Sequence, residues 1–180
     1  MTRQGVKTYS GTQRGAVIVE LAMVLPLLLL LVYGIADYAQ AIQAKNILIN
    51  ISREGANLAS RTSSSPLDIM SALATTAQPL EMARRGRMYI TRVEGRDGGP
   101  RVTEQYLWPG GYPSSSRVWG ECGRWLDGAC EMPDQLPTAN LDMDLANGEV
   151  VFAVEVFYSY QPLIGYVLQN TSELYSITLF

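Results

Sequence analysis

The sequence predicts an α+β protein, in which a long N-terminal helix, membrane-spanning in its first half, packs on a small and mostly antiparallel sheet. One observation is an apolar stretch of about twenty residues from Ala16 to Ile35, in which Glu20 is the only charge. The other is the downstream pattern, because beyond Gly86 the apolar period changes from near 3.6 to two, as in strands. No second stretch of this kind follows, so one membrane span is expected.

The apolar stretch has the length of a membrane helix. At about 1.5 Å per residue it spans about 30 Å of hydrocarbon. Arg3, Lys7 and Arg14 precede it without any acidic residue. By the positive-inside rule, residues 1–15 form a cytoplasmic basic leader, residues 16–36 cross the membrane, and the remainder is exported.

The helical pattern continues beyond the membrane. Ile42, Leu48 and Ile49 keep a period near 3.6, which predicts one helix from Ala16 to about Ser60 with an extracytoplasmic part at 37–62. Their apolar stripe is expected to pack on the exported domain, with a role as partner surface as the alternative.

The N-terminus has three possible fates, and Glu20 helps to distinguish them. A carboxylate near a bilayer is energetically costly, so its presence indicates a function. A secretory signal cleaved near Ala39-Gln40-Ala41 would have an unusually long apolar core. An uncleaved anchor leaves Glu20 without a role. Cleavage after Gly15 gives Glu20 a role, because the new amine of Ala16 lies one helical turn away. The helix macrodipole disfavours a cation at the N-terminus, and a nearby carboxylate offsets that cost.

The same residues carry a resemblance, which covers roughly residues 14–60. They are Arg14 to Leu30, with Gly15, Glu20 and Leu25-Pro26-Leu27 in order, and the later patch Arg53-Glu54-Gly55-Ala56. This pattern resembles the signature of TadE-like pseudopilins, minor components of the tight-adherence (Flp-type) pilus system of bacteria. Leu21 stands where Flp-type pilins usually place an aromatic residue.

The resemblance implies a pilin-like fold and a role in pilus assembly. It implies cleavage after Gly15 by a prepilin peptidase, and an assembly helix that uses Glu20, Leu21 and Pro26, with a kink expected at the proline. The implied location is the bacterial inner membrane, with the N-terminus cytoplasmic, the C-terminus outside, and later entry into an extracellular pilus open. The implied partners are other pilins or pseudopilins, the peptidase and the inner-membrane assembly platform.

The exported α+β domain, residues 63–180, is expected to contain one short helix and four strands. The helix begins at Pro66, with Ser65 as its N-cap, and runs to about Thr76. The strands are expected at Arg87–Val93, Arg101–Leu107, Glu149–Tyr160 and Ser172–Phe180, with a hairpin loop at Gly95–Pro100. In the third strand, Val154 and Val156 share one face, while Glu155 and Phe157 share the other.

The stretch Pro109–Gly148 is rich in Gly, Pro and Ser, and is predicted to have little core of its own. Cys122 and Cys130 are the only cysteines and lie on the exported side, so a disulfide is expected to close this loop. Chain entropy gives such a short loop about 2.5 kcal/mol. With two thiols and no histidine, no metal or cofactor site is predicted.

Charge narrows the function further. The precursor has 14 basic and 17 acidic residues, and removing the leader's Arg3, Lys7 and Arg14 leaves a net charge of −6, which makes nucleic acid an unfavourable partner. Without histidine, serine and cysteine nucleophiles lack their usual base, so we expect no enzyme.

The sequence therefore predicts a pilus assembly protein. The alternative is a membrane-anchored or secreted envelope domain, not part of a pilus, whose aromatic loop around Trp108, Trp119 and Trp125 contacts a surface or ligand. Exposed tryptophans would favour it.

Overall fold

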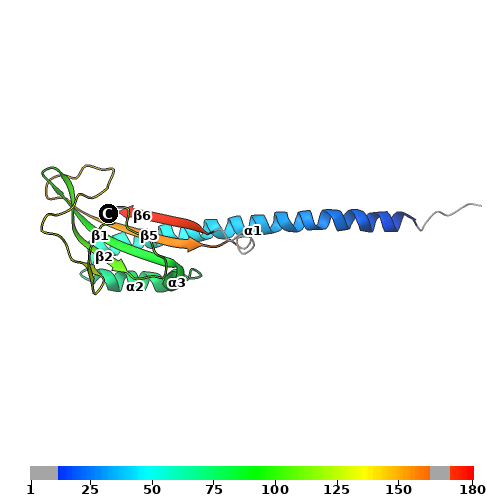
Figure 1. Ribbon diagram of the computed structural model, residues 1–180, viewed down its shortest axis with the longest axis horizontal. Helices are drawn as coiled ribbons and strands as arrows, with labels where there is room; N and C mark the ends of the chain where they lie inside the picture. Colours follow the sequence, from blue (N-terminus) through cyan, green and yellow to red (C-terminus); the bar gives the residue numbers. More distant parts are fainter. Residues whose placement is uncertain (1–11, 163–170) are drawn as a thin grey trace, which may run out of the picture.

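The computed structural model describes residues 12–162 and 171–180, and consists of one long helix that carries a small domain on its C-terminal half (Figure 1). The described elements are α1 (Thr12–Arg61), α2 (Pro66–Thr76), α3 (Met82–Arg85), β1 (Gly86–Arg96), β2 (Gly99–Trp108), β3 (Trp125–Leu126), β4 (Ala129–Cys130), β5 (Val150–Tyr160) and β6 (Ser172–Leu179). The predicted α+β class, with a long helix on an antiparallel sheet, is confirmed.

The C-terminal half of α1 supplies one wall of the main core. Its buried stripe runs through Ala44, Leu48, Ile51 and Ala56, which recur every three to five residues on one helix face. Leu48 was correctly predicted. The prediction for Ile42 was wrong, since Ile42 lies two residues before Ala44 and therefore points away from the sheet, where it is exposed.

The short helix α2 begins at Pro66, as predicted, and adds the second wall of this core. Ser65 is the N-cap residue, as predicted, and its side chain makes no capping hydrogen bond. Instead, the backbone oxygen of Ser65 accepts a hydrogen bond from Ile69 N at 3.0 Å. The single-turn helix α3 was not predicted, since four residues are too few to show a period.

The strands form one six-stranded sheet in the order β3-β4-β2-β1-β5-β6, with antiparallel pairing throughout. Strands β1 and β2 extend further than predicted, because Gly95 pairs with Pro100 and Arg96 with Gly99. The predicted loop at Gly95–Pro100 therefore shrinks to Asp97 and Gly98. Positive φ angles of 95° at Gly98 and 108° at Gly99 explain the glycines in this tight turn.

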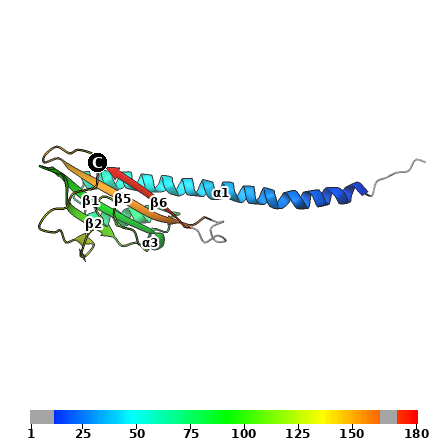
Figure 2. The same ribbon diagram turned by 45° about the horizontal axis from the view of Figure 1, so that its top comes forward.

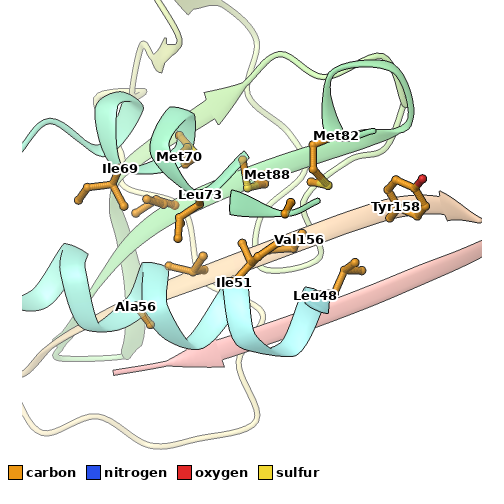
Figure 3. Packing of buried hydrophobic residues seen from close by; sticks show 13 residues of the cluster. Leu48, Ile51, Ala56, Ile69, Met70, Leu73, Met82, Met88, Val156 and Tyr158 are labelled. Carbon is orange, nitrogen blue, oxygen red and sulfur yellow. The ribbon is translucent and has the colours of Figure 1, made fainter. Parts of the chain in front are cut away.

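One face of the sheet is covered by the helices. Figure 2 shows α1 running along this face, and Figure 3 shows the side chains that fill the space between them. Val156 and Tyr158 of β5 lie in one core with Leu48 and Ile51 of α1 (Figure 3). Val154 of the same strand belongs to this core too, as the alternation in β5 predicted. The core also takes Ile69, Met70, Leu73, Met82, Met88 and Ile90 from α2, α3 and β1.

The other face of the sheet is covered by the segment 109–148. The prediction that this segment has little core of its own was wrong, because a second buried cluster joins it to the sheet. Its members are Val93, Val102 and Ala153 from the sheet, and Val118, Trp119, Cys130 and Ala139 from the segment. The predicted pair Cys122 and Cys130 is disulfide-bonded, with the Cα atoms 6.0 Å apart.

Candidate processing and assembly site

The N-terminal half of α1 projects away from the domain and makes no core (Figure 1). An 18-residue window within it has a mean hydropathy of 2.5, and none of that window is buried. Leu21, Leu27 and Leu30 are among the large apolar side chains that it exposes. Length and apolar composition make this helix able to span a membrane.

The residues predicted for processing all lie on this projecting half. Gly15 is exposed, and a Cβ atom added to it would meet nothing within 4 Å, so packing does not explain the glycine. Ala16 lies next on the helix, and Glu20 follows one turn later. The Glu20 side chain is exposed and has no hydrogen bond or ion pair with any residue that the structure describes.

Leu21 and Pro26, predicted for the assembly helix, also lie outside the core. Leu21 is exposed next to Glu20. The helix continues through Pro26, whose missing N–H leaves the backbone carbonyl of Ala22 without its helical donor. The predicted kink at Pro26 stays a prediction.

The later patch Arg53-Glu54-Gly55-Ala56 divides into two packing and two surface residues. A Cβ atom on Gly55 would lie 2.9 Å from Leu73 Cδ1 and 3.0 Å from Val154 Cγ1. Ala56 is fully buried beside it. Glycine here allows α1 to approach both α2 and β5 closely, whereas Arg53 and Glu54 are exposed along the groove between α1 and α2.

Polar contacts tie α1 to the edge strand β6. The buried Ser52 Oγ lies 2.9 Å from both Ser176 Oγ and Thr178 Oγ1, and donates to Ile49 O at 3.0 Å. About two turns earlier, Lys45 Nζ donates to the backbone oxygen of Tyr175. These contacts fix the register of the helix on β6, which apolar packing alone specifies less strictly.

A buried carboxylate on the opposite face of the sheet was not recognised as a site from the sequence. Glu155 of β5 is 0% exposed. Its oxygens accept hydrogen bonds from Ser116 Oγ, from Arg117 N at 2.8 Å and from Tyr175 Oη at 2.9 Å. Burial raises the pKa of the Glu155 carboxyl, while these hydrogen bonds lower it less. The available signal was one carboxylate inside an otherwise apolar strand.

Arg117 closes this cluster from the solvent side. Its guanidinium lies 3.9 Å from the Tyr175 ring centroid and pairs with Glu173 at 2.6 Å. Burial and the neighbouring Glu155 carboxylate raise the pKa of Tyr175. The cluster therefore anchors the segment 109–148 to β5 and β6, and Glu155 has a packing role that is separate from the helix.

The tryptophans do not form the exposed aromatic surface that the alternative function requires. Trp119 is buried in the second core. Trp108 is partly buried against the helix-side core, and Trp125 is partly buried against the core on the other face. The three rings thus lie on both faces of the sheet, and the condition that favoured the alternative is not met.

Comparison with known proteins finds a family model that is similar to part of α1. The model of the family described as TadE-like protein matches residues 15–57. This match confirms the resemblance predicted from the sequence, on the same part of the chain, and associates the chain with tight-adherence pilus systems. No curated protein matches significantly. No solved structure matches significantly either.

Proposed function

We propose that this chain, whose residues 15–57 match the TadE-like family, is a minor pseudopilin processed by a prepilin peptidase after Gly15. The observation that carries the proposal is the exposed apolar half of α1, with Glu20 one turn from Ala16 and without a hydrogen bond or ion pair to any described residue. The proposed location is the bacterial inner membrane, with the leader in the cytoplasm and the domain outside.

In this proposal, Glu20 offsets a charge that cleavage creates. A free amine at Ala16 would place a cation at a helix N-terminus, where the macrodipole disfavours it by about 0.3–1 kcal/mol. Glu20 can face that amine on the same helix, or on the helix of a neighbouring pilin or pseudopilin. The second arrangement selects a stagger between adjacent subunits, which supports a role in assembly on the inner-membrane platform.

The intact mass and the N-terminal sequence of the protein from its own cell envelope test the processing step. We expect a start at Ala16. A start near Ile42 would identify an ordinary secreted domain, and an intact Met1 would identify a plain anchor; either would contradict the proposal.

Two pairs of variants separate processing from assembly. Gly15→Val should block cleavage, whereas Gly34→Val should not, since a Cβ atom at Gly34 also meets nothing within 4 Å. Glu20→Ala should leave membrane insertion intact and impair piliation, whereas Met23→Ala, at an exposed residue of the same helix, should pilate normally. Electron microscopy that finds normal pili on Glu20→Ala cells would overturn the role assigned to Glu20.

A further inference from the structure

The segment 77–86, which joins α2 to β1 through α3, lies at the end of the domain that faces the membrane half of α1. Figures 1 and 2 both show α3 at the end from which α1 projects, and off the axis of that helix. Pro79 and Arg85 line a pocket of about 230 Å³ together with Gln40 and Ala44 of α1. The segment therefore meets α1 just beyond its apolar half.

The rise of α1 sets the height of this segment above the membrane. The predicted span ends at residue 36, so at about 1.5 Å per residue Gln40 lies about 6 Å and Ala44 about 12 Å beyond it. The polar headgroups occupy about 5–7 Å on each side of the hydrocarbon. The segment 77–86 is thus within about one Debye length of the headgroups, since that length is about 8–10 Å at moderate salt.

Two tyrosines of α1 mark the boundary between membrane and water. Tyr33 is 54% exposed and Tyr38 is 71% exposed, and they lie just before and just after the end of the predicted span. Tyrosine is enriched at the membrane–water interface, because its ring suits the apolar layer while its hydroxyl group stays hydrated. The interface is therefore expected near residues 33–38, where the apolar stretch also ends.

Arg84 and Arg85 of α3 bring two cations to this end of the domain. The side chain of Arg84 is 69% exposed, and its ion pair with Glu81 at 3.2 Å lies at the surface, where such pairs contribute little. Arg85 is half-buried and donates to Gln161 Oε1 at 3.1 Å. A guanidinium has five N–H donors in a planar fork, so both arginines keep donors that these contacts do not use.

The far end of the domain has the opposite charge balance. The segments 94–101 and 142–149 meet there, since Asn147 Nδ2 donates to Asp97 Oδ1 at 3.2 Å. Together they hold five acidic and two basic residues, whereas the segment 77–86 holds one acidic and two basic residues. An anionic membrane surface repels the first group and attracts the second. Its field therefore favours the orientation in which α3 faces the membrane.

We propose that Arg84 and Arg85 bind the phosphate groups of anionic lipids at the extracytoplasmic surface of the membrane, and that this contact tilts α1 toward α3. Guanidinium groups bind phosphate oxygens in pairs. Because α3 lies off the axis of α1, a tilt of about 20°, which is usual for membrane helices, brings the arginines closer to the headgroups. The inference rests on the membrane location proposed above. It gives the domain a second attachment, which fixes its direction before it meets other subunits.

The test uses the full-length protein with one copy per lipid nanodisc, so that neighbouring copies do not contribute. Bilayers of phosphatidylcholine alone are compared with bilayers that also contain phosphatidylglycerol. A fluorophore on Ala83→Cys, at an exposed position of α3, is quenched by lipids that carry a nitroxide on the headgroup. The same fluorophore on Asn147→Cys, at the far end, should not be quenched. A helix that does not insert would leave the protein outside the nanodiscs, which contradicts the membrane location and is a different result from absent docking.

We expect quenching at Ala83→Cys to rise when phosphatidylglycerol is present. In this labelled background, Arg84→Gln and Arg85→Gln should each lower the ratio of docked to undocked protein about fivefold, because each removes one cation near an anionic surface. Arg96→Gln is the matched control, since Arg96 also makes an exposed ion pair at 3.2 Å, with Glu94 at the far end, and it should be quenched as the parent is. Equal quenching with and without phosphatidylglycerol, or unchanged quenching in Arg84→Gln, would overturn the proposal.

Discussion

Replacing Glu155 by leucine should destabilise the domain strongly, because it removes the acceptor on which three donors from distant parts of the chain converge. These donors are Ser116 Oγ, Arg117 N and Tyr175 Oη. Each buried donor left unpaired costs about 1–3 kcal/mol. Allowing the segment to relax, we expect a loss of about 3–5 kcal/mol in the free energy of unfolding.

Glu155→Gln tests the charge separately from the contacts. Glutamine keeps the size of the side chain and one acceptor oxygen. We therefore expect the free energy of unfolding to fall by about 1 kcal/mol relative to wild type at the same pH. Urea unfolding of the full-length protein in nanodiscs, followed by tryptophan fluorescence, measures both variants. Glu121→Gln, at an exposed glutamate of the same segment, is the control and should change little.

The difference in stability between wild type and Glu155→Gln should depend on pH with a definite sign. Burial raises the pKa of the Glu155 carboxyl above 4.5, so the folded state holds its proton where the unfolded chain has lost it. The stability from this group is complete below the unfolded pKa and is lost as pH rises from about 4.5 through the folded pKa. The stability of wild type relative to Glu155→Gln should therefore fall from acidic to neutral pH. A relative stability that rises with pH would refute the reasoning, since hydrogen bonding to the carboxylate would then outweigh burial.

Further variants test the packing and the disulfide. Leu48→Ala, at a fully buried position of α1, should lower the free energy of unfolding in urea by about 2–5 kcal/mol, whereas the exposed Ile42→Ala should change it by less than about 0.5 kcal/mol. Gly55→Val should cost about 1–3 kcal/mol in the same assay, because even a Cβ atom meets Leu73 and Val154; unchanged stability would contradict the close approach. Cys122→Ser with Cys130→Ser should cost about 2.5 kcal/mol, and reducing agent should then shift the midpoint of wild type but not of the double variant.

The elements that the sequence predicted correctly have a local period. Leu48 and its neighbours repeat at helical spacing, and Val154 and Val156 alternate with Glu155 and Phe157. Each pattern therefore predicts both the type of element and the face that is buried. The apolar stretch before them is long enough to be recognised by length alone.

The parts that were missed depend on contacts between distant segments. Gly95 and Pro100 have the composition of a loop, yet both pair in the hairpin. The glycine is required because a Cβ atom there would collide with Ala146 O, from a segment about fifty positions later. Likewise the layer formed by 109–148 has no period, and is held by such contacts as Asn140 N to Val118 O at 2.8 Å. Single-segment patterns do not contain this information.

The two faces of the sheet are constrained differently. The segment matching the TadE-like family ends at residue 57, close to the end of α1, and its second half packs on β5 and β6 through Gly55 and Ser52. The helix side of the sheet must therefore fit the helix, whereas the other side is covered, among the described residues, by the segment 109–148. A chain can change that segment without disturbing the helix, provided that an anchor such as Glu155 holds it to the sheet.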